Sequence, residues 1–283
     1  MKGYDLVIYY IIQVKNMLGA IIGDVIGSLY EFESDKTKDF MLFVPGCRPT
    51  DDSVLTVAVG CACAEANCYD EYEFKHVLAE KLREIGLQYR GAGYGKRFYQ
   101  WMILNEDEPY GGNTNGSAMR VSPTAWAVDT LEDVERLAKW SAEITHSHPE
   151  GIKGAQAVAA AIFLARTGSS KNEIRKYIEQ KYYDLDFTVD EIRPGYQHDM
   201  TCEGSVPQAI VCFLDSEDFE DAIRNAVSLG GDGDTQACIA GAIAEAFYGI
   251  PDELQEEVFD YIDDNLQDYY WEYAGQLYEK NSN

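Results

Sequence analysis

The chain has 283 residues, of which 46% are hydrophobic and 12% aromatic. This composition is sufficient to bury a core, so intrinsic disorder is excluded. Acidic residues number 49 against 23 basic residues, which gives a formal net charge of −26. Such a charge repels nucleic acid and anionic membranes from most of the surface. We therefore expect neither as a partner, and we expect a monomer.

The cysteines and the N-terminus indicate a cytoplasmic protein. Seven cysteines occur without any Cys-x-x-Cys spacing, which disfavours both a disulfide framework and a zinc site. The apolar run Leu6–Ile12 is too short to cross a bilayer and is not followed by a signal-peptide cleavage site. We interpret residues 1–16 as an N-terminal extension, a strand or an upstream start, and residues 17–283 as one domain.

Apolar periodicity and Gly, Pro or Asn breaks predict a helical protein. The predicted helices are Met17–Tyr30, Ser53–Ala66, Phe74–Leu87, Leu131–Ile144, Gly154–Arg166, Asn172–Lys181, Val206–Leu214, Phe219–Leu229, Gln236–Tyr248 and Asp252–Tyr269. Strand-like patterns are limited to Leu6–Ile12 and Phe40–Val44. The pattern therefore predicts one compact α domain.

Glycines recur along the first predicted helix. Gly19, Gly23 and Gly27 are spaced four residues apart. Three glycines inside a helix cost roughly 2–3 kcal/mol relative to alanine. Close approach of another helix would offset this cost, and the Ala- and Gly-rich stretch 236–246 has the same character. We therefore expect these helices to pack tightly at the centre of the bundle.

Two Thr/Asp motifs precede or open small-residue helices. The first is Thr50-Asp51-Asp52-Ser53 and the second is Asp232-Gly233-Asp234-Thr235. Either motif alone could be a helix N-cap with acids in the first turn. If the helices pack together, however, unpaired carboxylates about 4 Å apart would repel by about 4 kcal/mol per pair at an effective dielectric of 20. Hard oxygen donors favour Mg²⁺, Mn²⁺ or Ca²⁺, and four carboxylates could hold two ions.

Three further segments are candidates for a site. The Gly/Asn-rich loop Gly111–Arg120 could hold a phosphate on backbone N–H groups, or could simply be a capped loop. His146 in Thr-His-Ser-His-Pro could bind a ligand or be a structural histidine. Glu31, one turn after Gly27, could reach the cleft or be a surface acid.

The chain resembles the ADP-ribosylglycohydrolase family, which includes dinitrogenase reductase-activating glycohydrolase and the ADP-ribosyl hydrolases. The matching motifs occur in the family's order: GAIIGDVIGSLYEF, TDDS, GNTNGSAMRVSP, ITHSHPEGIKGAQAVA, SVPQAI and GGDGDTQACIAGAIAEAFYG. The resemblance implies an all-α orthogonal helical bundle with two Mg²⁺ or Mn²⁺ ions in a central cleft. It assigns Glu31 as the catalytic residue. The implied metal ligands are Thr50, Asp51, Asp52, Asp232, Asp234 and Thr235, and the implied substrate-binding residues are Gly112, Asn113, Asn115, Gly116, Ser117 and His146.

The implied activity is metal-dependent hydrolysis of the glycosidic bond between ADP-ribose and an acceptor. That acceptor would be a protein side chain or a small molecule, linked through nitrogen or oxygen. The motifs leave the acceptor open, and they do not decide whether Glu31 acts as acid or base. One alternative is a catalytically silent ADP-ribose-binding or structural member of the same fold. Another is a glycosyltransferase that uses Asp232-x-Asp234 as its metal motif.

Overall fold

The computed structural model describes residues 16–30, 36–106 and 108–282, with side chains up to residue 276. The proposed extension 1–16 and its apolar run therefore lie, apart from residue 16, outside the described residues. The helices are α2 (Leu18–Gly27), α3 (Asp51–Glu65), α4 (Glu71–Gly86), α5 (Lys96–Leu104), α6 (Gly116–Met119), α7 (Thr124–Ala127), α8 (Leu131–Glu143), α9 (Pro149–Arg166), α10 (Lys171–Lys181), α11 (Val189–Ile192), α12 (Cys202–Leu214), α13 (Phe219–Leu229), α14 (Gly233–Tyr248), α15 (Asp252–Glu257) and α16 (Asp264–Ser282), with 3-10 turns η1 (Leu87–Tyr89) and η2 (Val258–Asp260).

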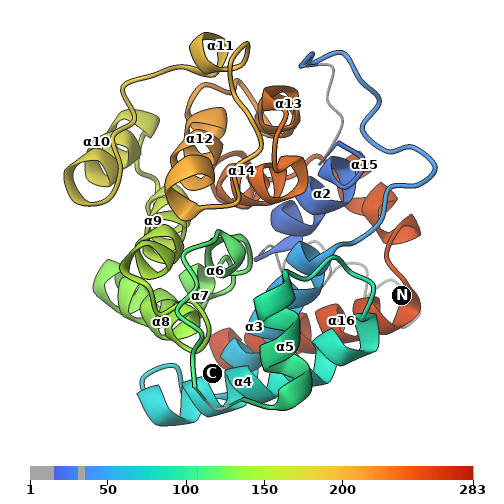
Figure 1. Cartoon of the computed structure of the whole chain (residues 1–283), viewed down its shortest axis with the longest axis vertical. Coiled ribbons are helices and arrows are strands. Elements are labelled where there is room, and N and C mark those ends of the chain that lie inside the picture. Colours follow the sequence, from blue (N-terminus) through green and yellow to red (C-terminus); the bar gives the residue numbers. More distant parts are fainter. Residues whose placement is uncertain (1–15, 31–35, 107, 283) are drawn as a thin grey trace.

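The predicted all-α class is confirmed. Helices fill the view in Figure 1, and the described part of the chain contains isolated β-bridges but no sheet. Helix α14 packs against α2, α13, α12 and α9, while α3 packs against α4 and α16. Asp232-x-Asp234 leads directly into α14, whereas the glycosyltransferase alternative would place such a motif after a strand of an α/β sheet. The helical architecture argues against that alternative.

Side-chain caps fix where many of the helices begin. Thr50, Asp70 and Thr130 each accept a backbone N–H bond at the start of α3, α4 and α8. His148 caps α9, where its Nδ1 accepts from the Glu150 N–H at 3.1 Å and Pro149 occupies the first turn. This cap explains why α9 begins five residues before the predicted start at Gly154.

The three glycines of α2 bring its backbone against α14, as predicted. A Cβ on Gly23 would lie 2.0 Å from the Ala237 carbonyl oxygen, and one on Gly27 would lie 2.6 Å from the Asp234 Cα. Every residue of α2 is buried. At the far end of the contact, the Gly19 N–H donates to Glu245 Oε2 at 2.9 Å. Helices from opposite ends of the sequence therefore form the centre of the bundle.

Some elements of the structure differ from the predicted ones. Phe40–Val44 is irregular rather than a strand, because the described residues contain no strand with which it could pair. The Phe40 ring packs against Tyr30 instead, with ring centroids 5.0 Å apart. The predicted helix Asp252–Tyr269 is divided into α15 and α16, because the Asp263 carboxylate accepts from the N–H groups of residues 265 and 266 and starts a new helix. Helices α5, α7 and α11 are absent from the predicted elements.

Candidate active site

The first Thr/Asp motif is anchored to Asp24, a residue that sequence analysis did not select. The Thr50 N–H and hydroxyl donate to the two Asp24 carboxylate oxygens at 2.8 and 2.6 Å. The N–H of Ser53 donates to Asp24 Oδ2 at 3.0 Å, and its hydroxyl donates to the same oxygen. Asp24 is the only charged residue of α2. A charge inside an apolar helix requires such partners, and that requirement was the signal available in the sequence.

The second motif enters α14 through a glycine turn. Gly230 and Gly231 have φ values of +63° and +140°, which residues with a side chain rarely adopt. The Asn115 side-chain amide donates to Asp232 Oδ2 at 2.6 Å. Burial raises the pKa of Asp232, and this hydrogen bond opposes the increase. The loop that contains Asn115 is thus joined directly to the second motif.

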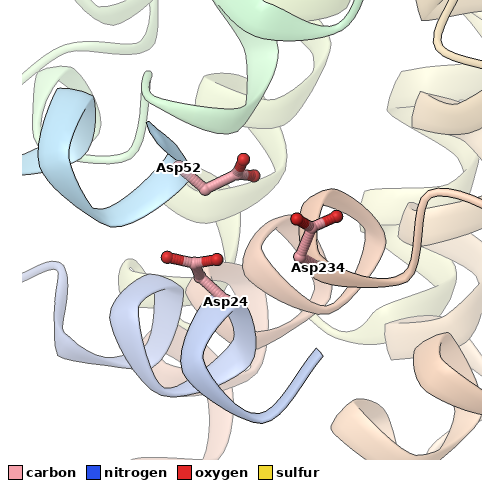
Figure 2. A group of neighbouring side chains, drawn as sticks. All are labelled: Asp24, Asp52 and Asp234. Atoms are coloured by element: carbon pink, nitrogen blue, oxygen red, sulfur yellow. The ribbon is translucent and has the colours of Figure 1, made fainter. Parts of the chain in front are cut away.

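The two motifs meet Asp24 in a buried triad of carboxylates. Oxygen atoms of Asp24, Asp52 and Asp234 all lie within 4.8 Å of one another. Figure 2 shows the three carboxylates facing one another from α2, α3 and α14. The structure therefore brings one aspartate of each predicted motif together and adds Asp24 as the third member of the group.

The triad has the electrostatic properties of a cation site. Burial raises the pKa of Asp52 well above its usual range, and the charges of Asp234 and Asp24 add to the increase. Burial also raises the pKa of Asp24, against the hydrogen bonds from Ser53 and Thr50. The Oδ1 atom of Asp52 is buried and has no hydrogen-bond partner. A divalent cation would offset the repulsion between the three carboxylates and would give Asp52 Oδ1 a partner. Carboxylate oxygens are suitable ligands for Mg²⁺, Mn²⁺ or Ca²⁺.

A cavity of about 320 Å³ opens beside the triad. All six predicted metal ligands line it, as do five of the six predicted substrate-binding residues: Thr50, Asp51, Asp52, Asp232, Asp234 and Thr235, and Gly112, Asn113, Asn115, Gly116 and His146. The exception is Ser117, which is fully buried and donates its hydroxyl to the Gly151 carbonyl at 2.8 Å. Glu31, the predicted catalytic residue, lies outside the described residues.

The Gly/Asn loop rests on a buried histidine. The His146 ring packs edge-on against Tyr110, with ring centroids 5.3 Å apart, and Thr114 Oγ1 lies 3.1 Å from its Nε2. A Cβ on Gly112 would lie 2.7 Å from this ring, so only glycine fits there without a shift, and a Cβ on Gly116 would make a tight contact of 3.1 Å. Burial, helped by the charge of a nearby arginine, lowers the pKa of His146 well below its usual range. His146 is therefore neutral at pH 7.

That arginine is Arg120, whose guanidinium is fully buried at the cavity. Its Nη2 donates to the Ser141 carbonyl at 3.0 Å and to Thr145 Oγ1 at 2.9 Å. Burial lowers its pKa to about 10, so it remains charged at pH 7. Its Nε and Nη1 have no hydrogen-bond partner in the described structure. The wall beside the Gly/Asn loop thus carries a fixed positive charge, opposite in sign to the triad.

Comparisons with known proteins agree with this geometry. Residues 14–283 match the model of the ADP-ribosylglycohydrolase family. The human ADP-ribosylhydrolase ARH3 is 28% identical, over 85% of this chain and 87% of its own length. The ADP-ribosylarginine hydrolase Tri1 of Pseudomonas putida is 26% identical, over 86% of this chain and 72% of its own length.

A solved structure described as an ADP-ribosylglycohydrolase-related protein complex has the same fold. It superposes with a TM-score of 0.66 at 20% identity, covering 95% of this chain and 98% of the other. None of the described helices is both long enough and apolar enough to span a membrane. With the family model matching nearly the whole sequence, we conclude that this chain belongs to the ADP-ribosylglycohydrolase family.

Proposed function

We propose that the protein hydrolyses the glycosidic bond between ADP-ribose and an acceptor, with divalent cations held at the aspartate triad. The observation that best supports this is the meeting of Asp24, Asp52 and Asp234 beside a cavity that also contains the Gly112–Gly116 loop. The proposed cation site and the proposed phosphate-binding loop therefore share one cavity, whose volume suits a small ligand. The names of the relatives, ADP-ribosylhydrolase and ADP-ribosylarginine hydrolase, agree with this reaction.

Two Mg²⁺ or Mn²⁺ ions are proposed as cofactors. Their ligands would include the six predicted motif residues, Thr50, Asp51, Asp52, Asp232, Asp234 and Thr235. To these we add Asp24. The unpartnered Asp52 oxygen supports this assignment. When bound, the cations would orient the hydroxyls of the distal ribose and polarise a water molecule at its anomeric carbon.

The surrounding residues hold the site in shape. Asn115 fixes the orientation of Asp232 by its 2.6 Å hydrogen bond. Neutral His146 supports the Gly/Asn loop, whose role would be to bind the diphosphate. Ser117 would contribute by holding the loop to Gly151. Glu31 is proposed as the general acid or base, an assignment that rests on its place in the family motif.

The linkage and the setting of the reaction are parts of the proposal. Both serine-type oxygen linkages and arginine-type nitrogen linkages are candidates. The seven cysteines are buried and free, which supports a reducing compartment such as the cytoplasm. The alternative of a silent ADP-ribose-binding member predicts binding without turnover.

Release of ADP-ribose from serine- and arginine-modified peptides, measured with Mg²⁺ or Mn²⁺ and with EDTA, tests the proposal. We expect release that requires the metal and that falls by orders of magnitude in Asp52→Asn. Asp264→Asn, at an exposed first-turn position of α16, is the matched control and should keep full activity. Tight ADP-ribose binding without release from any peptide would favour the silent alternative, and activity unchanged by EDTA would refute the metal assignment.

Glu31→Gln separates catalysis from binding. A glutamine keeps the shape of the side chain but cannot accept a proton, so turnover should fall by about 10²–10⁴-fold with metal and ADP-ribose affinities retained. Loss of metal binding in this variant would make Glu31 a ligand rather than a general acid or base.

A further inference from the structure

Three exposed basic residues are among those that line the cavity. Arg48, Lys96 and Arg97 are exposed and border the same cavity as the triad. We call them the basic rim. The chain has more than two acidic residues for each basic one, so its composition does not predict a cluster of three basic residues. Within the residues that the structure describes, none of the three forms an ion pair.

Two of the rim cations lie where they do not stabilise their own helix. Lys96 and Arg97 occupy the first turn of α5, where the helix dipole disfavours cations. This turn has no acidic residue, and Gly95 provides no side-chain cap. The first turns of α3, α4, α8 and α13 all contain acids instead. An external anion at the start of α5 would be attracted by both the dipole and the cations.

Arg48 and Lys96 are connected to the aspartate end of the cavity. Arg48 precedes the first Thr/Asp motif by one residue, Pro49. The Asp51 N–H donates to the Ala92 carbonyl at 3.0 Å, and a Cβ on Gly93 would lie 3.0 Å from Asp51 Oδ1. The loop leading to Lys96 therefore lies directly against the proposed metal site. Arg97 lies toward the Gly/Asn loop instead: its guanidinium is 5.6 Å from the ring centroid of Tyr110, which packs against His146.

The contact between the loop before Lys96 and Asp51 leads us to place Arg48 and Lys96 on the acceptor side of the scissile bond. In the proposed function, the diphosphate occupies the Gly112–Gly116 loop, where Arg120 already supplies a buried positive charge. The glycosidic bond would lie at the triad. A group attached beyond that bond leaves through the cavity mouth, where the exposed rim meets it.

We infer that the basic rim selects acceptor polypeptides that carry acidic side chains next to the ADP-ribosylated residue. This inference rests on the proposed function. A polypeptide fits better than a nucleic acid, because three cations can match two or three carboxylates, whereas the net charge of −26 repels a long polyanion. Complementary charges at the edge of a binding site contribute mainly to association rate and specificity.

The test compares two ADP-ribosylated peptides of the same length and linkage. One has Asp and Glu around the modified residue, and the other has Asn and Gln. Wild-type kcat/KM should be about tenfold higher for the acidic peptide, given roughly twofold to fivefold from each exposed ion pair. The ratio should approach one at about 500 mM salt because exposed charges are then screened. R48Q/K96Q/R97Q should lose the preference at low salt.

The control variant R136Q/K139Q/K176Q removes the same charge from α8 and α10, away from the cavity, and should keep the preference. Equal wild-type rates for the two peptides would overturn the inference. Calorimetry on the rim variant gives a second check. If its affinity for free ADP-ribose falls as much as its rate on the acidic peptide, the rim binds the diphosphate and the inference is overturned. A stronger preference for an ADP-ribosylated DNA end would also overturn it. If the wild type neither binds ADP-ribose nor cleaves either peptide, the proposed function itself fails.

Discussion

Replacing Gly23 by alanine should destabilise the protein by pushing α2 away from α14. The new Cβ would lie 2.0 Å from the Ala237 carbonyl oxygen, whereas an ordinary contact is about 3.4 Å, so the two backbones must separate by about 1.4 Å. A backbone carbonyl cannot rotate away, which places the cost near the upper end of the 1–3 kcal/mol typical of overpacking. The higher helix propensity of alanine offsets about 1 kcal/mol of this cost. We expect the free energy of unfolding to fall by about 2 kcal/mol.

Two other glycines provide a graded comparison for the same substitution. A Cβ on Gly60 would meet the Met17 sulfur at 3.1 Å and the Tyr273 ring at 3.3 Å, and the flexible methionine can move aside. A Cβ on Gly275, in the exposed part of α16, would meet nothing within 4 Å. Gly60→Ala should therefore be close to neutral, and Gly275→Ala should stabilise by up to about 1 kcal/mol.

Urea unfolding followed by far-UV circular dichroism, with EDTA present, measures this series. The reasoning requires that Gly23→Ala be the least stable variant and Gly275→Ala the most stable. If Gly23→Ala were as stable as the wild type, the close contact between α2 and α14 would be refuted. If Gly23→Ala does not fold, the order of the other two variants still tests the geometry.

Three further predictions concern charge. Asp24→Asn should lower the Mg²⁺ affinity at least tenfold, because the buried triad loses one carboxylate. The measurement is the Mg²⁺-induced increase in melting temperature, which should be lost in this variant. Burial raises the pKa of Asp52, so the metal-free protein should lose stability as the pH rises through that raised pKa. Adding Mg²⁺ should reverse this loss. If the stability of the metal-free protein instead rises over this pH range, the prediction is contradicted. Burial raises the pKa of Glu135, but hydrogen bonds from Lys181, Tyr177 and Tyr182 outweigh it and the net pKa is lowered. Glu135→Gln should therefore cost about 2 kcal/mol at pH 7, and its difference from wild type should shrink as the pH falls through the folded-state pKa of Glu135.

Sequence reasoning predicted the parts of the site that depend on local chemistry. Threonine and aspartate at a helix start have a cap preference that is independent of the rest of the fold, so both Thr/Asp motifs could be identified. The glycine spacing in α2 similarly implied a close helix neighbour. The prediction that the motifs converge is confirmed for Asp52 and Asp234.

The missed features depend on tertiary contacts. Asp24 lies within an apolar stretch, and only the packing of α2 against α3 shows that its carboxylate accepts bonds from Thr50 and Ser53. Helix α5 follows three glycines that favour a loop, although Phe98, Trp101 and Met102 have helical spacing and are buried. Their burial depends on neighbours that are distant in sequence, so local propensity could not decide between loop and helix.

The hydrogen bond between Gly19 and Glu245 joins residues 226 positions apart, and this separation has a consequence for synthesis on the ribosome. At 5–20 residues per second, roughly 10–45 s pass between the emergence of α2 and that of α14. During that interval α2, all of whose residues are buried in the finished protein, has no partner helix for its glycine face. The aspartate triad cannot form until Asp234, which follows more than four fifths of the chain, has left the ribosome. Chains that end before α14 therefore lack the triad, and the newly made protein acquires it only when α14 packs against α2.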